Sequence, residues 1–167
     1  DGKLVSHGDL LKSTAYLPAD RHGEALMMTM SVRENAAISA LRKFAKLSFI
    51  SRTKETKVVL DSLTSLAVKA PSMDASVSSL SGGNQQKIVM SRSLLSTPTM
   101  IIADEPTQGV DVGARAEIYQ ILRDVAEDGI PVIVNSSDTK ELEGLCDRVY
   151  VMSRGHIVKS LEGNQVT

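Results

Sequence analysis

The chain has 167 residues, of which 42% are apolar, and its 19 lysines and arginines nearly balance its 20 aspartates and glutamates. Near-neutral charge argues against a domain that holds nucleic acid by bulk positive potential, so we expect no nucleic-acid partner. The single cysteine excludes a disulfide framework and a cysteine-based zinc site. No apolar run approaches the roughly 20 residues of a membrane-spanning helix. These properties predict a soluble, cytosolic, mixed α/β domain.

The first residues predict short strands. Two extended pieces are expected, at Leu4-Val5 and at Thr14–Leu17, and Pro18 ends the second because proline cannot donate a hydrogen bond to a sheet. The chain begins at Asp1 in a phrase that is typical of the middle of a sheet. We therefore expect it to be part of a longer protein.

A helical segment is predicted next. Ser31-Val32-Arg33-Glu34 is a capping box, with serine at the N-cap and glutamate three positions later, and it predicts a helix start. Apolar residues at steps of four and three predict a second helix from about Thr53 to Val68, with Pro71 ending it. The serine-rich stretch Ser72–Ser79 is interpreted as a linker.

From Leu80 onward, predicted helices and strands alternate. The helices are expected at Gly82–Leu95, Val112–Glu127 and Lys140–Leu145, and the strands at Met100–Ala103, Pro131–Val134, Val149–Met152 and Ile157–Val158, the last two as a hairpin. This order predicts a parallel sheet covered by helices.

A glycine pair opens the first of these helices, in the sequence Leu80-Ser81-Gly82-Gly83-Asn84-Gln85. Glycines let a phosphate approach the backbone closely, and the free amides at a helix N-terminus favour an anion. Ser81 adds a hydroxyl at the N-cap position. Taken alone, the motif is more often a flexible turn before a capped helix than a phosphate site.

Two carboxylates, Asp104 and Glu105, follow the apolar strand that begins at Met100. Open α/β sheets bind ligands at this end of their strands. One carboxylate could hold Mg²⁺ while the other orients a water for attack on a phosphate. The acid pair alone could equally be a polar strand end, and Asp111 could be catalytic or could cap the helix that starts at Val112.

In this order and spacing, the two motifs resemble those of ABC-type ATPases. The glycine motif resembles their signature motif, and Ile101–Asp111 resembles their Walker B strand, catalytic glutamate and D-loop. Further details are similar to the second, C-terminal nucleotide-binding domain of bacterial importers of ribose, galactose or xylose: Asn84-Gln85-Gln86-Lys87, Gly109–Ala114, Ala15–Arg21 and Ser31–Asn35.

The resemblance covers nearly the whole chain and implies a RecA-type P-loop NTPase fold with an inserted helical subdomain. It divides the chain into a partial core with the Q-loop region (1–30), the helical subdomain (31–79), and a core with the signature motif, Walker B strand and D-loop (80–167).

Three departures from the family pattern affect the expected activity. No Gly-x-x-x-x-Gly-Lys-[Ser/Thr] loop is present in the sequence. The Q-loop glutamine falls on Ala19, which cannot ligate Mg²⁺ or water, and the switch histidine falls on Ser137, which cannot serve as a cationic contact. We therefore expect the isolated chain neither to bind ATP at micromolar affinity nor to hydrolyse it.

The absent loop also affects the expected sheet. In the family its strand lies between those that match Pro131–Val134 and Val149–Met152. Adjacent strands lie roughly 4.8 Å apart, so without it the two edges would face each other unpaired. We expect the edges to close up, or to be filled by a segment of this chain or by a strand from a second copy, which makes the isolated chain a candidate homo-oligomer.

The resemblance also implies the parts of a transport ATPase that uses ATP and Mg²⁺. Glu105 would be the catalytic base, Asp104 the metal ligand and Asp111 part of the D-loop, while the signature residues would contact the γ-phosphate of an ATP held by the other nucleotide-binding domain; those residues are Ser81, Gly82, Gly83 and Asn84. Ala19 and Ser137 would weaken the site of Glu105 only.

The implied partners are that other domain and a transmembrane permease, which would face residues 19–30 and the helix that starts at Ser31. A periplasmic sugar-binding protein would be an indirect partner, and the assembly would lie at the cytoplasmic face of the bacterial inner membrane. The alternative is an ABC ATPase of translation or DNA repair without a membrane partner.

Overall fold

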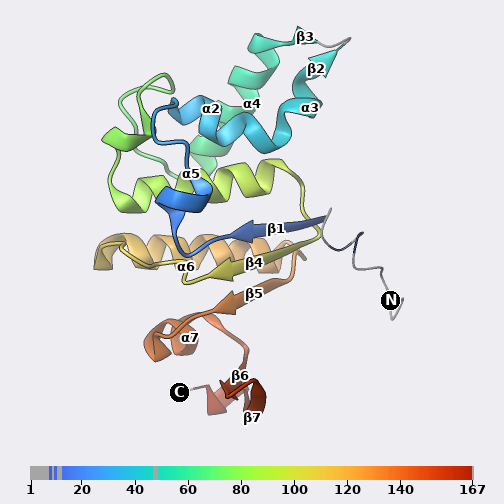
Figure 1. Ribbon diagram of the computed structural model, residues 1–167, viewed down its shortest axis with the longest axis vertical. Helices are drawn as coiled ribbons and strands as arrows, with labels where there is room; N and C mark the ends of the chain where they lie inside the picture. The colour runs from blue at the N-terminus through green and yellow to red at the C-terminus, as the bar shows by residue number, and fades with distance from the viewer. Residues whose placement is uncertain (1–7, 9, 11–12, 47–48, 167) are drawn as a thin grey trace.

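The computed structural model describes residues 8, 10, 13–46 and 49–166. A parallel sheet lies in the middle of the molecule, a helical group lies at one end and a hairpin at the other (Figure 1). The strands are β1 (Thr14–Leu17), β2 (Ala45–Lys46), β3 (Phe49–Ile50), β4 (Met100–Asp104), β5 (Val132–Asn135), β6 (Arg148–Ser153) and β7 (His156–Glu162). The α-helices are α2 (Val32–Ala37), α3 (Leu41–Phe44), α4 (Arg52–Ser65), α5 (Gly82–Leu95), α6 (Val112–Glu127) and α7 (Thr139–Leu145). Short helical turns are η1 (Arg21–Ala25), η2 (Ile38–Ala40), η3 (Val77–Ser79) and η4 (Gly163–Gln165).

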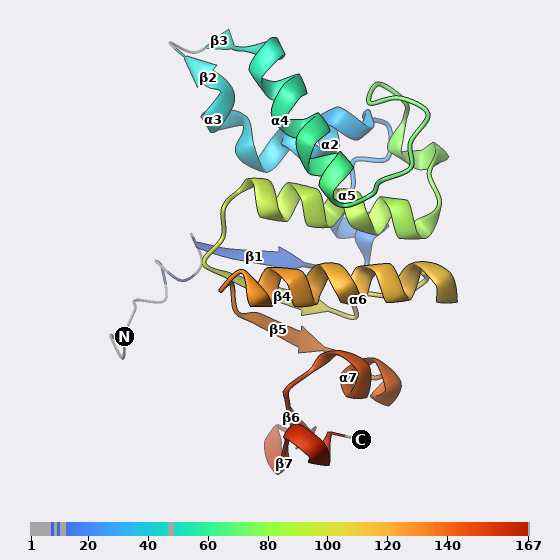
Figure 2. The same ribbon diagram turned by 180° about the vertical axis from the view of Figure 1, so that it is seen from behind.

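The central sheet has the strand order β1-β4-β5, and both pairings are parallel, as predicted. Ile102 of β4 lies between Tyr16 of β1 and Ile133 of β5. Helix α5 packs on β1 and on α6, and α6 lies along the sheet (Figure 2). The carboxyl ends of three parallel strands therefore meet at one edge of the sheet.

The capping box is confirmed at the start of α2. The Ser31 Oγ accepts a hydrogen bond from the Glu34 amide at 3.2 Å, and a Glu34 carboxylate oxygen accepts one from the Ser31 amide at 2.9 Å. Helix α4 has the predicted buried stripe, but its predicted end near Val68 is wrong. The helix ends at Ser65 because Ala67 adopts a left-handed conformation with φ of 49°, so the chain turns before it reaches Pro71.

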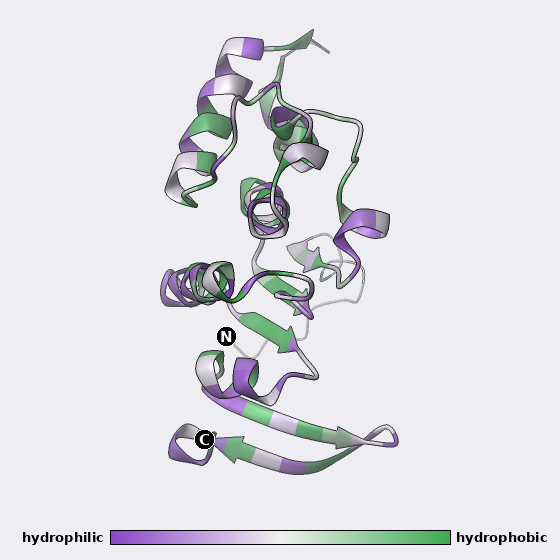
Figure 3. Cartoon of the chain, turned by 90° about the vertical axis from the view of Figure 1, so that its left-hand side faces the viewer, coloured by the Kyte–Doolittle hydropathy of each residue, from purple (hydrophilic) through white to green (hydrophobic). Residues whose placement is uncertain are grey.

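The predicted hairpin is confirmed as β6 and β7. Its two-residue connection, Arg154-Gly155, has positive φ at both positions (49° and 79°), which matches the twist of the paired strands. Apolar and polar residues mix along both strands (Figure 3), and most of these side chains are exposed, Met152 by 66% and Ile157 by 61%.

The expected closing of the sheet between β5 and β6 is wrong. Among the described residues β5 pairs only with β4 and β6 only with β7, and none forms a strand between them. A cavity of about 960 Å³ separates the two strands and is lined by both of them and by α7. The start of α7, which connects the two strands, contacts other parts of the chain: Glu141 is bonded to Thr107 and Asp138 is paired with Arg115. Filling by a second copy stays a prediction, and the strand expected at Leu4-Val5 lies outside the described residues.

Cys146 follows α7 and lines this cavity. Burial, together with the nearby charges of Asp147 and Glu141, raises the pKa of its thiol above the usual value. We expect its alkylation by iodoacetamide to be slower at pH 8 than in the same chain unfolded in urea, because less thiolate is present. The alkylation rate should also reach its plateau at a higher pH in the folded chain than in the unfolded chain. A pH midpoint of the folded chain equal to or below that of the unfolded chain would contradict this expectation.

None of the helices in the described ranges combines the length and apolar character needed to cross a membrane.

Candidate functional site

Asp104 ends β4, and both of its carboxylate oxygens accept hydrogen bonds from the neighbouring strands. The Tyr16 hydroxyl of β1 donates to Oδ2 at 3.1 Å, and the Asn135 Nδ2 of β5 donates to Oδ1 at 2.7 Å. The bond to Asp104 also raises the pKa of the Tyr16 phenol. The sequence pattern pointed to neither partner, although Asn135 ends β5 just as Asp104 ends β4. The three strand ends thus hold one carboxylate in place.

Glu105 has an unusual backbone conformation, with φ of 45°. A left-handed conformation in a non-glycine residue costs on the order of 1 kcal/mol, and such residues cluster at functional sites. The Glu105 amide donates to the Asn135 carbonyl at 2.8 Å. Its carboxylate accepts hydrogen bonds from the Ser137 amide at 2.7 Å and from the Ser136 hydroxyl at 3.4 Å. Glu105 is therefore held against the loop that follows β5.

The loop after Glu105 is anchored to α7 and α6. The Thr107 hydroxyl donates to the Glu141 carboxylate at 2.7 Å, and both residues are buried. Asp111 precedes α6 and accepts a hydrogen bond from the Ala114 amide at 2.9 Å, so its interpretation as a helix cap is confirmed. Thr107 and Glu141 gave no signal in the sequence because their pairing joins two segments that are distant in the chain.

Helix α5 begins at Gly82, with Ser81 at the N-cap position. The Ser81 Oγ accepts a hydrogen bond from the Asn84 Nδ2 at 3.0 Å instead of from the first amides of the helix. The Asn84 Oδ1 accepts one from the Lys69 amide at 2.7 Å. A Cβ on Gly83 would lie 2.5 Å from the Ala114 Cβ, so this glycine is required by the packing of α5 on α6.

A second cavity of about 350 Å³ lies beside this helix start. It is lined by Lys69, Ser81, Gly83, Asn84, Lys87, Asp111, Gly113, Ala114 and Glu117. The buried Lys87 ammonium contacts the Glu117 carboxylate at 2.7 Å, and the Lys87 hydrogen bond lowers the pKa of Glu117. The structure thus brings three predicted signature residues and Asp111 together in one hollow, whereas Asp104, Glu105 and Ser137 lie at the sheet edge and do not line it.

Ala19 follows β1 by two residues and is half-buried. In the register of the sheet Leu17 lies beside Ala103, so Ala19 leaves β1 at the same edge at which Glu105 leaves β4. Its methyl group offers no donor or acceptor there.

The donor set at the sheet edge fits a hard cation. Within the described ranges no three acidic, histidine or cysteine side chains gather as a metal cage. Asp104 and Glu105 supply only oxygen ligands, and a carboxylate that accepts two hydrogen bonds keeps free lone pairs. Mg²⁺ is commonly held by one or two carboxylates together with substrate phosphates. The residues present therefore fit Mg²⁺ bound with a phosphate ligand.

Comparison with known proteins places this arrangement in a family. The family model described as ABC transporter matches residues 4–108. The ribose import ATP-binding protein RbsA 1 of Rhizobium johnstonii is 44% identical over 92% of the chain, and the xylose import ATP-binding protein XylG of Geobacillus kaustophilus is 40% identical over 92%. The chain spans only about 30% of the length of each of these relatives.

The fold agrees with this placement. A dimeric bacterial ABC transporter cassette has a TM-score of 0.76 to this structure at 22% sequence identity, over 95% of this chain and 68% of the other. The predicted fold class, a parallel α/β sheet of the P-loop NTPase type, is confirmed. The chain belongs to the ABC transporter family.

Proposed function

We propose that this chain is part of the ATP-hydrolysing subunit of a bacterial carbohydrate importer. The observation that carries the proposal is the Asp104–Glu105 pair at the carboxyl end of the central parallel strand, with Glu105 in a strained conformation. The similarity to ribose and xylose import ATP-binding proteins supports a sugar as the cargo class.

Asp104 is proposed as the Mg²⁺ ligand and Glu105 as the base. Mg²⁺, when bound, would neutralise charge on the phosphates. The hydrogen bonds from Tyr16 and Asn135 orient the Asp104 carboxylate toward the sheet edge. The Glu105 carboxylate accepts from the Ser137 amide and would take a proton from an attacking water at its remaining lone pairs.

The residues at the start of α5 are proposed to act on a second site. Ser81, Gly82, Gly83 and Asn84 would contact the γ-phosphate of an ATP whose other phosphates are held by a partner nucleotide-binding domain. The support is the N-terminus of a 14-residue helix that Ser81 does not cap through its side chain, next to an open cavity lined by Ser81 and Asn84. The helix dipole and its first amides favour an anion at this position.

The two sites are proposed to be unequal. The sheet-edge site has Ala19 and Ser137 where the family pattern has a glutamine and a histidine, and the serine reaches Glu105 through its backbone amide. The signature residues keep the family pattern. This domain would therefore complete a competent ATP site on its partner while its own site is weak.

We also propose how the chain is divided and where the assembly lies. Residues 1–30 and 80–167 would form the core and 31–79 the helical subdomain. The segment from Ala19 to Met30 would face the permease, and the assembly would lie at the cytoplasmic face of the inner membrane and serve a periplasmic sugar-binding protein.

Reconstitution tests this proposal. The complete gene product, incorporated into vesicles with the permease encoded beside it, should hydrolyse ATP faster when the sugar-loaded binding protein is added. Hydrolysis that needs no permease and does not respond to one would favour the alternative, an ABC ATPase of translation or DNA repair.

The isolated chain offers a second measurement. Calorimetric titration with Mg-ATP should show no micromolar binding. The phosphate-binding loop supplies most contacts to the β- and γ-phosphates in P-loop NTPases, and its motif is absent from this sequence. A clear micromolar isotherm would contradict this expectation.

A further inference from the structure

Arg21, the first residue of η1, joins three segments that are distant in sequence. Its Nη1 donates to the Gln108 carbonyl at 2.5 Å, its Nη2 to the Gly109 carbonyl at 3.1 Å, and its Nε to the Gln85 Oε1 at 3.4 Å. Gln108 and Gly109 form the turn after Glu105, and Gln85 lies in the first turns of α5. One guanidinium therefore links the segment after Ala19 to both halves of the proposed ATP machinery.

Two glycines lie against this side chain. A Cβ on Gly82 would lie 2.8 Å from the Arg21 Nη2 and 2.8 Å from the Gly109 carbonyl oxygen. Gly109 itself has φ of 66°, and a Cβ there would lie 3.4 Å from both terminal nitrogens of Arg21. The missing Cβ at Gly82 therefore makes room for the guanidinium, whereas glycine at position 109 is favoured by its left-handed backbone.

The charge and shape of the Arg21 guanidinium explain why arginine, and not lysine, suits these contacts. Burial lowers the pKa of the guanidinium, although it stays protonated, and its position beside the N-terminus of α5 is unfavourable for a cation. The carbonyl oxygens offset that cost through charge-assisted hydrogen bonds. The planar fork of arginine can serve two adjacent carbonyls at once, whereas a lysine ammonium is a point charge that cannot reproduce this geometry.

The Gln85 side chain, which accepts from the Arg21 Nε, is itself held by two further contacts. The Gln85 Oε1 lies 2.8 Å from the His22 Nε2, and the Gln85 Nε2 donates to the Val77 carbonyl at 3.2 Å. Gln85 is buried, so its amide stays in one orientation. The anchor of Arg21 on α5 is therefore a fixed point of the fold.

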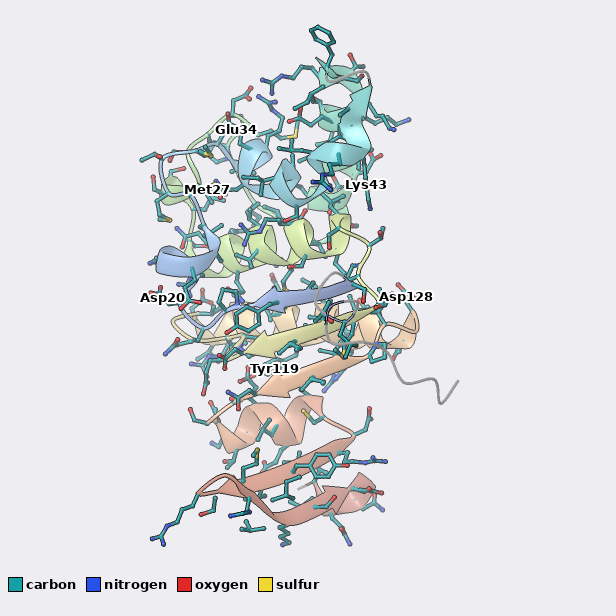
Figure 4. All side chains as sticks on the ribbon, turned by 45° about the vertical axis from the view of Figure 1, so that its right-hand side comes forward. Asp20, Met27, Glu34, Lys43, Tyr119 and Asp128 are labelled. Atoms are coloured by element: carbon teal, nitrogen blue, oxygen red, sulfur yellow. The ribbon has the colours of Figure 1, made fainter. Side chains whose placement is uncertain are left out.

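We propose that Arg21 is a positioning residue that sets the Gln108–Gly109 turn relative to the glycine pair of α5. The Gln108 amide donates to the Glu105 carbonyl at 2.9 Å, so a displacement of the turn reaches Glu105 directly. A movement of the segment between Asp20 and Met27, both labelled in Figure 4, would thus change the proposed base and the proposed phosphate contacts together. The part of this inference that concerns catalysis rests on the proposed function.

Hydrogen exchange of the complete gene product tests the structural part. In Arg21→Gln and Arg21→Lys, peptides that cover residues 105–111 should exchange at least about tenfold faster, while those from β4 and α6 keep their rates. Gly82→Ala should reproduce this local change, because its added Cβ displaces the guanidinium. The exposed Arg42 of α3, changed to glutamine, is the matched control and should leave these peptides unaffected.

Steady-state kinetics on the same proteins test the catalytic part. We expect kcat for ATP to fall in both Arg21 variants with KM nearly unchanged. Three results would each overturn the proposal. The first is unchanged exchange in Arg21→Gln, and the second is full retention of protection and of kcat in Arg21→Lys. The third is faster exchange throughout the protein. If the unmodified protein hydrolyses no ATP, the proposed function fails, whereas the exchange result on the turn still decides the role of Arg21.

Discussion

Replacing Ser81 by aspartate is expected to lower the ATPase activity of the complete gene product by about 100-fold or more. The added carboxylate would lie in the cavity at the start of α5, where the proposed γ-phosphate would approach. The helix itself should not suffer, because aspartate is a favoured N-cap residue and its charge is stabilised by the helix dipole. The variant should therefore lose activity at equal or higher thermal stability, as measured by kcat for ATP and by Tm.

Glu105→Gln in the same protein should cost less, below about tenfold, even though loss of a general base commonly costs 10²-fold or more. Under the proposed inequality, Ala19 and Ser137 weaken the site of Glu105, so little of the total activity would depend on it. Ser79→Asp is the matched control, since Ser79 is an exposed serine two residues earlier that does not line the cavity. Equal losses from the Ser81 and Glu105 changes would contradict the proposed inequality of the two sites.

Replacing Gly83 by alanine is expected to reduce the free energy of unfolding by about 1–3 kcal/mol. Helix propensity alone predicts the opposite sign, a gain of up to about 1 kcal/mol. The clash decides the outcome, because the new Cβ would lie 2.5 Å from the Ala114 Cβ of α6. Gly144 of α7 is the matched control: a Cβ there meets no atom within 4 Å, so Gly144→Ala should stabilise by about 0.5–1 kcal/mol.

The double variant Gly83→Ala/Ala114→Gly separates the clash from other causes. It transfers one methyl group from α6 to α5, so much of the lost stability should return in urea unfolding of the three proteins. A double variant whose loss equals the sum of the two single losses would show that the two positions are not coupled. A larger side chain at Gly83 would disturb the packing of α5 on α6, so a loss of ATPase activity in such a variant would not by itself show that Gly83 contacts phosphate.

The sequence by itself determined the features that depend on local pattern. Helix α5 begins at the predicted Gly82 and ends at the predicted Leu95. Strand β4 and helix α6 follow from an apolar run and a regular buried stripe, and Asp111 caps α6 as a short polar residue before a helix does. The resemblance to ABC ATPases rested on the same local motifs, which is why it could be stated before the fold was known.

The tertiary structure alone decided the contacts between distant segments. No local pattern relates Tyr16 and Asn135 to Asp104, Arg21 to the Gln108–Gly109 turn, or Thr107 to Glu141. Each of these hydrogen bonds joins residues at least 31 positions apart. The separation of β5 from β6 was also visible only in the tertiary structure, where β5 pairs with β4 and β6 with β7 among the described residues. Periodicity and capping act over a few residues, whereas these contacts depend on how the sheet brings the ends of its strands together.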